Sequence, residues 1–147
     1  MQITGTRFGE IDVDTRKVIA LRTGLIGFPN ETRFVLFSPD PSKPIAWLQS
    51  LKTPALAFPV VESTRIRPPY PTETDQTLAR QAGLGTEDVS IYVIVSVRPK
   101  APKVLANLLA PIVVDRARGS GAQIVLDAKR YAASTPLGPM PSARPDA

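Results

Sequence analysis

The chain has little of the side-chain chemistry on which enzymes rely, because its 147 residues include neither cysteine nor histidine. Cysteine supplies thiolate nucleophiles and zinc ligands, and histidine is the commonest acid–base group near neutral pH. Serine–histidine–aspartate triads, cysteine–histidine dyads and HExxH zinc sites are therefore excluded. Carboxylate-pair and Ser–Lys mechanisms stay open, since Asp, Glu, Ser and Lys are all present. We predict a protein that is not an enzyme and that uses no cofactor or metal.

Acidic side chains alternate with apolar ones at Glu10-Ile11-Asp12-Val13-Asp14. In a strand, this period of two places Glu10, Asp12 and Asp14 on one face. Carboxylates with this spacing project in parallel and cannot by themselves surround a hard cation with oxygen ligands. We therefore predict a solvated acidic ridge, defined by Glu10, Asp12 and Asp14, that is suited to contact a basic partner.

Two glycine-containing segments share only part of the pattern of an anion-binding loop. Residues 24–29 (Gly-Leu-Ile-Gly-Phe-Pro) lack the Gly-Lys-Ser/Thr ending of a phosphate loop, and no helical pattern follows them. Residues 116–121 (Arg-Ala-Arg-Gly-Ser-Gly) join two predicted strands, where Gly and Ser favour a hairpin turn over an anion cradle. We predict tight turns at both places.

The net charge of +5 comes entirely from the last third of the chain. Residues 1–97 contain ten basic and ten acidic residues, whereas residues 98–147 contain eight and three. A nucleic-acid groove interleaves such cations with aromatic side chains for base stacking, and only Tyr131 lies near them in the sequence. We predict a solvated, solubilising surface and no direct nucleic-acid contact. The alternative is a nucleic-acid-binding barrel of the OB type that uses this basic third as a phosphate groove. The cations concerned include Arg98, Lys100, Lys103, Arg116, Arg118, Lys129 and Arg130.

Short apolar runs separated by Gly and Pro indicate an all-β, mainly antiparallel fold. Residues 91–97 are apolar at nearly every position, which is typical of a strand covered on both faces, and we predict that they form the central strand. Pro59 cannot donate to a strand ladder, so it marks an edge or a bulge. We expect one β-barrel-like domain over residues 1–135. Its predicted strands are 18–21, 33–37, 45–51, 56–61, 89–98, parts of 104–114, and 123–126.

One short helix is predicted over residues 75–82. Thr72, Thr74 and Asp75 are N-cap candidates, and Gly83 suits the left-handed position that follows a helix. Leu78 and Ala79 belong to the face that must pack on the sheet, because so short a helix is unstable alone.

Both ends of the chain carry a recognisable composition. The N-terminal residues lack the basic and apolar regions of a signal peptide, and no apolar run approaches the roughly 20 residues that span a bilayer. We therefore expect a cytoplasmic protein without a membrane partner. Residues 136–147 are rich in proline and poor in apolar mass, which predicts a disordered tail.

Two aromatic residues are candidates for burial or for partner contact. Trp47 lies in an apolar run and is predicted in the core, because large aromatic side chains dominate burial. Tyr70 follows two prolines in a predicted loop, where an exposed tyrosine is a good anchor for a partner.

Several of these segments, in this order, resemble the flagellar assembly factor family, FliW. The resemblance spans roughly residues 3–137 and implies a compact β-barrel-like protein with no catalytic role. It also implies that the protein binds CsrA, a dimeric RNA-binding translational regulator, and so relieves repression of flagellin synthesis. Flagellin itself is implied as a competing partner. The segments are 24–29, 47–51, 54–61, Tyr70, 107–112, 121–126, Tyr131 and 136–137.

The chain departs from the family pattern at Asp115 and Ala133, where Asn and Arg are typical. CsrA is basic around its RNA-binding surface, so this basic chain would need a local acidic face to dock on it. The acidic ridge is one candidate face, and Glu73, Asp75, Glu87 and Asp88 around the helix are another. We expect a monomer. Its predicted partner-binding residues are Glu10, Asp12, Asp14, Gln49, Tyr70 and Asn107.

Overall fold

The computed structural model describes residues 1–138, which form mainly β-strands with one short α-helix, as predicted. The strands are β1 (Gln2–Thr6), β2 (Gly9–Asp12), β3 (Ile19–Leu21), β4 (Arg33–Phe37), β5 (Ile45–Ser50), β6 (Ala57–Glu62), β7 (Val89–Val97), β8 (Val104–Ala106), β9 (Ile112–Asp115), β10 (Ser120–Gln123) and β11 (Thr135–Pro136). The helices are α1 (Asp75–Gln81) and the 3₁₀ turns η1 (Thr15–Lys17) and η2 (Ser63–Arg65). No helix in the described part of the chain has the length and apolar character needed to cross a membrane.

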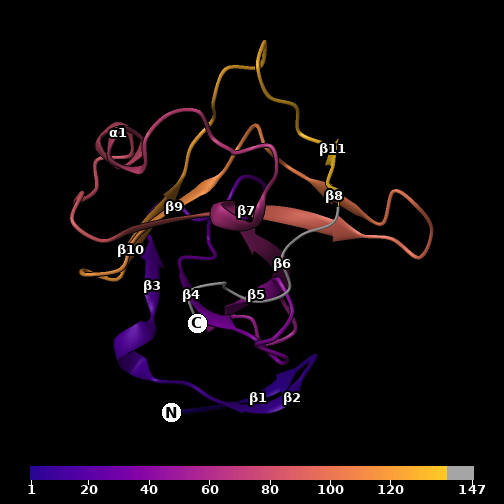
Figure 1. Cartoon of the computed structure of the whole chain (residues 1–147). Helices are drawn as coiled ribbons and strands as arrows, with labels where there is room; N and C mark the ends of the chain where they lie inside the picture. Colours follow the sequence, from indigo (N-terminus) through magenta and orange to yellow (C-terminus); the bar gives the residue numbers. More distant parts are fainter. Residues whose placement is uncertain (139–147) are drawn as a thin grey trace.

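Seven strands close into a barrel, in the order β3–β4–β5–β6–β7–β9–β10 and back to β3 (Figure 1). Neighbouring strands are antiparallel except β3 and β10, which are parallel. Strand β7 bonds β6 along one edge, and β9 and then β8 along the other. The prediction of an all-β, barrel-like fold with β7 as the central strand is confirmed.

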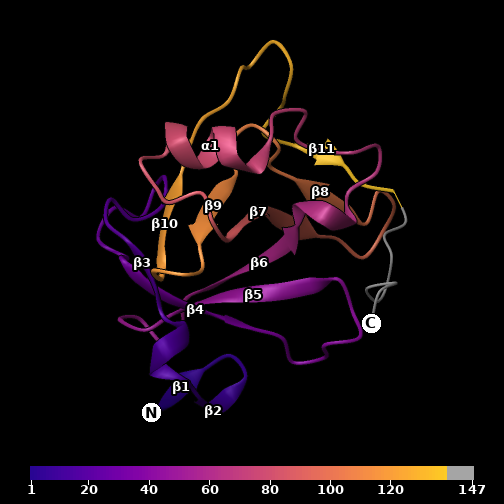
Figure 2. The same ribbon diagram turned by 60° about the vertical axis from the view of Figure 1, so that its left-hand side comes forward.

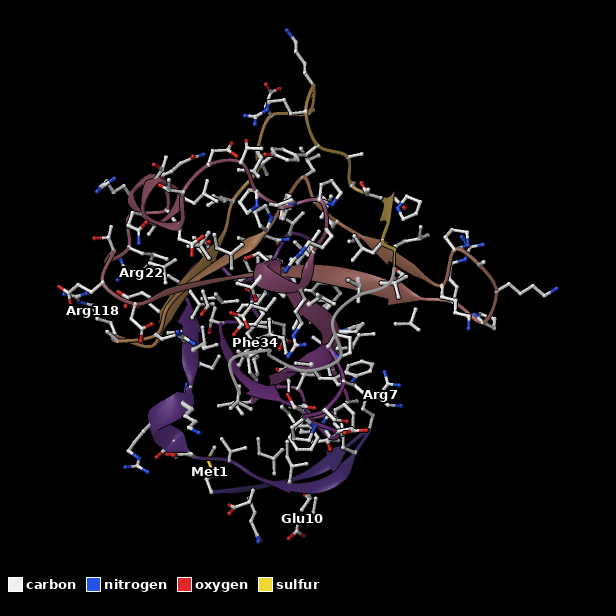
Figure 3. All side chains as sticks on the ribbon, viewed as in Figure 1. Met1, Arg7, Glu10, Arg22, Phe34 and Arg118 are labelled. Atoms are coloured by element: carbon white, nitrogen blue, oxygen red, sulfur yellow. The ribbon has the colours of Figure 1, made fainter. Side chains whose placement is uncertain are left out.

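Two apolar clusters lie on the two faces of the barrel wall. The interior cluster includes Leu21, Phe34, Val60 and Ile112, each at most 1% exposed. Figure 3 shows Phe34 near the middle of the molecule. The outer cluster lies between the wall and α1 and is centred on Val93, which is 0% exposed. Because β7 contributes to both clusters, its almost unbroken apolar sequence is explained.

Helix α1 begins and ends at the predicted signals. The Thr74 hydroxyl accepts a hydrogen bond from the Thr77 amide at 3.1 Å, and Gly83 follows the helix with a φ of +74°. Leu78 and Ala79 are fully buried against the sheet. The helix and the β1–β2 hairpin lie on opposite sides of the barrel (Figure 2).

The N-terminal hairpin is the largest element that the sequence did not predict in full. Strand β1 pairs with β2, and Ile3, Ile11 and Val13 pack on Val35 of β4. Trp47 is half-buried beneath this hairpin, with the Phe8 ring centroid at 5.3 Å and the Arg7 guanidinium at 4.1 Å. The predicted burial of Trp47 is therefore only partial, because one side of the ring meets a cation rather than the core.

Pro59 lies where β6 bonds a single neighbour. It is opposite Trp47 of β5, whereas pairing of β6 with β7 begins one residue later, at Val60 and Ile94. A missing N–H is tolerated on such a free edge. The predicted edge position of Pro59 is confirmed.

Two boundaries near the C-terminus differ from the predictions. Strand β10 spans Ser120–Gln123 rather than 123–126, because Gly121 is needed inside the strand. A Cβ there would meet the Leu21 side chain at 2.7 Å and the Val113 carbonyl at 3.0 Å. Pro136 and Leu137, predicted within the disordered tail, instead join the sheet: Pro136 pairs with β8, and Leu137 packs on the outer cluster. The rest of that predicted tail, 139–147, lies outside the described residues.

Candidate functional site

The predicted acidic ridge is formed by two residues rather than three. Glu10 and Asp12 are exposed on β2, on either side of the buried Ile11, as the alternation predicted. Figure 3 shows Glu10 directed away from the barrel. Asp12 Oδ1 lies 3.6 Å from the Met1 amino nitrogen. Asp14 lies beyond the strand and does not extend the ridge.

Asp14 caps η1 and pairs with Arg16. Its carboxylate accepts hydrogen bonds from the Arg16 backbone amide at 3.0 Å and from the Arg16 guanidinium at 3.1 Å. The side-chain and backbone hydrogen bonds from Arg16 lower the pKa of Asp14. The carboxylate is thus already satisfied locally, and the acidic ridge is redefined as Glu10 and Asp12.

Tyr70 is buried rather than exposed, so the predicted exposure of this side chain is wrong. The side chain is 8% exposed, and its hydroxyl donates to the Leu108 carbonyl oxygen at 2.6 Å. Its ring packs edge-on against Tyr131 at 5.3 Å. Burial raises the pKa of Tyr70 far above its usual range. The prolines around Tyr70 fold the loop inward, and the hydroxyl satisfies a loop carbonyl that lies away from the sheet.

The Gln49 and Asn107 side chains also form hydrogen bonds with backbone groups of nearby loops. Gln49 is fully buried, and its Nε2 donates to the carbonyl oxygens of Ser50 and Pro54 at 2.9 Å each. Asn107 Oδ1 accepts from the backbone amides of Leu109 and Ala110 at 3.2 and 3.1 Å. The Gln49 amide nitrogen and the Asn107 amide oxygen thus hydrogen-bond backbone groups close to them in the sequence, while Gln49 Oε1 is buried without a hydrogen-bond partner.

Two of the four acidic residues around α1, Glu73 and Asp88, are paired with cations. Glu73 accepts from the Tyr131 hydroxyl at 2.9 Å and lies 3.5 Å from Arg130. Burial raises the pKa of Glu73, but hydrogen bonds from its own backbone and from Tyr131 have the opposite effect. The lowering effects are larger together, so the pKa of Glu73 lies below its usual value. Asp88 pairs with Arg116 at 2.8 Å, and Glu87 is exposed. This face is therefore less negative than the sequence suggested.

Asp115, one of the two departures from the family pattern, is buried and fastens the β9–β10 hairpin. Its carboxylate accepts from the backbone amides of Arg118 and Gly85 at 3.2 Å each, and from the Arg118 guanidinium at 3.3 Å. A Cβ at position 85 would meet Asp115 Oδ2 at 2.7 Å, so the approach requires glycine. Burial raises the pKa of Asp115, but the hydrogen bonds from Arg118 and Gly85 outweigh it and lower the pKa.

Asp115→Asn is expected to lower the free energy of unfolding at neutral pH. Both carboxylate oxygens accept hydrogen bonds from N–H groups, and the NH₂ group of asparagine would replace one of these acceptors with a donor. The folded-state pKa of Asp115 is below the unfolded value, so its stabilisation is present above about pH 4 and is lost as the pH falls through the folded-state pKa. Urea unfolding of both proteins at about pH 7 and about pH 3 should show a difference that shrinks in acid. A difference independent of pH would contradict this role.

Two large apolar side chains project from the predicted turn at residues 24–29. Ile26 is 62% exposed and Phe28 is 40% exposed, although both belong to a rigid segment. Gly24 has a φ of +69°, and a Cβ there would lie 2.4 Å from the Phe28 carbonyl oxygen. Leu25 and Phe28 form a β-bridge. We call Ile26 and Phe28 the apolar turn surface.

Gln123 and the core hold this surface in place. Gln123 Oε1 accepts from the Ile26 amide at 2.8 Å, while its Nε2 donates to the Ala110 carbonyl oxygen at 3.0 Å. The Phe28 ring packs edge-on against Phe58 at 5.1 Å, and Phe58 lies 6.3 Å from Phe34. The sequence predicted the turn but missed its exposed face.

Two cavities of the described residues are lined by apolar side chains, together with basic ones in the first and uncharged polar ones in the second. One of about 300 Å³ opens at an end of the barrel, with Leu36, Tyr92 and Val114 in its lining and Arg16 and Arg116 among its cations. Another of about 250 Å³ lies beside the apolar turn surface. Neither lining contains Asp or Glu, and residues 1–138 hold no group of three acidic side chains close enough to bind a metal.

Comparison with known proteins gives one consistent relationship. A model of the FliW protein family matches residues 2–137. The flagellar assembly factor FliW of Syntrophus aciditrophicus is 37% identical over 132 residues, which cover 89% of this chain and 84% of the relative. That of Geobacter sulfurreducens is 36% identical over 141 residues, covering 93% and 86%.

The fold gives the same answer. A crystal structure of the flagellar assembly factor FliW superimposes with a TM-score of 0.79 at 31% identity, covering 95% of this chain and 98% of the other. The comparisons of sequence and of fold therefore give the same family over almost the whole described chain. This chain belongs to the FliW family.

Proposed function

We propose that this protein acts in flagellar assembly as a cytoplasmic, monomeric binding factor with two protein partners. It antagonises CsrA, which relieves repression of flagellin synthesis, and it also binds flagellin. The relatives that carry the name flagellar assembly factor support the broad role. The two partners follow from the resemblance of the motifs. Competition between them would couple the flagellin level to flagellin translation.

The observation that carries a protein-binding role is the apolar turn surface. An exposed Ile26 and Phe28 on a rigid turn cost little conformational entropy to bury, because the turn is already fixed by Gly24 and Gln123. Aromatic residues such as Phe are enriched at the buried centre of protein interfaces, and the adjacent Ile26 enlarges the apolar area. Phe28 packs on Phe58 with one side of its ring, whereas most of Ile26 faces solvent, so burial of Ile26 and of the open side of Phe28 against a partner would add binding energy.

Calorimetric titration tests the proposal directly. The purified protein is titrated with CsrA and, separately, with flagellin from the same organism, at low and high salt. Submicromolar binding that survives added salt supports the proposal, since a partly apolar interface responds weakly to salt. Absence of binding to both partners, with salt-sensitive RNA binding instead, would favour a nucleic-acid-binding barrel.

The acidic ridge of Glu10 and Asp12 is proposed as a contact for CsrA. Glu10→Lys is expected to weaken CsrA binding by roughly 3- to 10-fold at low salt, because a charge pair at an interface rim is modest and screened. Asp127→Lys, an equal charge change at an exposed residue outside both candidate acidic faces, serves as the control. Equal affinity of the two variants for CsrA in calorimetry would remove the ridge from the interface.

A further inference from the structure

The hairpin between β7 and β8 extends beyond the barrel. Figure 1 shows it projecting on the right, away from the other strands. Val97 and Val104 are its last paired residues, and the Arg98 amide donates to the Lys103 carbonyl oxygen at 2.6 Å. Val97 is 56% exposed, although it is an apolar residue in a strand. We call residues 97–103 the basic arm.

The basic arm concentrates positive charge that no salt bridge within residues 1–138 offsets. Arg98, Lys100 and Lys103 are all exposed, and no acidic residue occurs in the sequence between Asp88 and Asp115. Among residues 1–138, none of these three cations takes part in a salt bridge. Uncompensated charge on a projecting element is the strongest local source of electrostatic attraction that this surface offers.

The other cations of the basic last third behave differently. Arg116 pairs with Asp88, Arg118 with Asp115, and Arg130 with Glu73. These pairs lie on other parts of the barrel, so the basic third does not form one continuous groove. A phosphate groove for nucleic acid needs such continuity, together with aromatic side chains for stacking, and residues 96–104 contain no aromatic residue.

The arm is also pre-ordered. Pro99 and Pro102 restrict the backbone of its loop, and the bond from Arg98 to Lys103 closes it. A restricted loop loses less conformational entropy when it is immobilised on a partner. The exposed Val97 adds an apolar contact beside the cations, a combination that is typical of the rim of a protein interface.

We propose that the basic arm docks on an acidic surface of a protein partner and accelerates its association. This proposal adds a docking element to the proposed function. It rests on the proposed function only for the identity of the partner. Electrostatic steering acts mainly on the association rate and fades as salt screens it. The dissociation rate is set elsewhere, by apolar contacts such as those of Ile26 and Phe28.

Two charge-matched variants test this docking role. In the arm variant, Arg98→Gln, Lys100→Gln and Lys103→Gln are combined. In the control, Lys43→Gln, Arg80→Gln and Lys129→Gln remove the same charge from exposed residues elsewhere. Stopped-flow association with flagellin and with CsrA is measured at low and high salt. The arm variant should associate about 3- to 10-fold more slowly with one partner at low salt, with the difference lost at high salt. Equal rates for the arm and control variants would overturn the proposal.

A second measurement does not depend on either partner. The wild-type protein is titrated with an acetylated Glu-Glu-Leu-Glu-Glu amide peptide and followed by amide chemical shifts. Shifts centred on residues 96–104 support the arm even if neither partner binds, in which case only the proposed function fails. Shifts spread evenly over all exposed cations overturn it. Tight, salt-steep binding of a uridine 20-mer that is lost in the arm variant would also overturn it, in favour of RNA.

Discussion

Ile26→Asp is expected to weaken binding of CsrA or flagellin by about 30-fold or more, the range typical of an interface hot spot. Ile26 is 62% exposed, so a carboxylate at this position stays solvated in the free protein. In the complex, the same carboxylate would be buried without a partner, which is costly. The affinity is measured by calorimetry for each partner separately. The partner that loses affinity is the one that uses the apolar turn surface.

Two further variants make this prediction specific. Ile26→Val keeps an apolar side chain and should retain affinity within a few-fold, whereas Ala133→Asp places a carboxylate on another exposed loop and should have no effect. Thermal unfolding of all three proteins should be close to that of the wild type, since surface changes rarely matter to stability. Undiminished binding of the Ile26→Asp protein to both partners would show that the turn is not the interface.

Phe34→Ala is expected to lower the free energy of unfolding by ~3–5 kcal/mol, the usual range for a fully buried phenylalanine. Phe34 is 0% exposed and lies within the barrel interior. The next residue of the same strand, Val35, packs on the N-terminal hairpin. Removing the ring leaves a cavity between β3, β4 and β5 that the closed barrel cannot collapse to fill. Urea unfolding, followed by Trp47 fluorescence and by circular dichroism, gives the change.

The matched control is Val125→Ala, which also shortens an apolar side chain but at a position that is 58% exposed. Its effect on the unfolding free energy should stay within about 0.5 kcal/mol. A loss below about 1 kcal/mol for Phe34→Ala would mean that the barrel interior is not close-packed. Because Phe34 supports Phe58, and Phe58 supports Phe28, the variant should also loosen the apolar turn surface.

The elements were predictable wherever one local signal governed them. Strand β4 has the predicted bounds, and α1 begins at the Thr74 cap and ends before Gly83, because caps and glycine act within a few residues. Strand β10 was displaced because Gly121 is required by the approach of Leu21 and Val113, which are distant in sequence. Glycine occurs both in turns and where two segments pack closely. Only the packed barrel shows which of these two roles Gly121 has.

The sequence by itself determined the class of this protein: an all-β barrel without cysteine or histidine, whose central strand is apolar on both faces. It determined the ridge at Glu10 and Asp12 as well, because a period of two is a local property of one strand. Tertiary structure alone decided which polar and aromatic residues face solvent. Tyr70 and Gln49 turned inward to satisfy backbone carbonyls of loops, while Ile26 remained outside on a turn too tight to bury it. Burial depends on what distant segments bring to each side chain, and the local pattern does not contain that information.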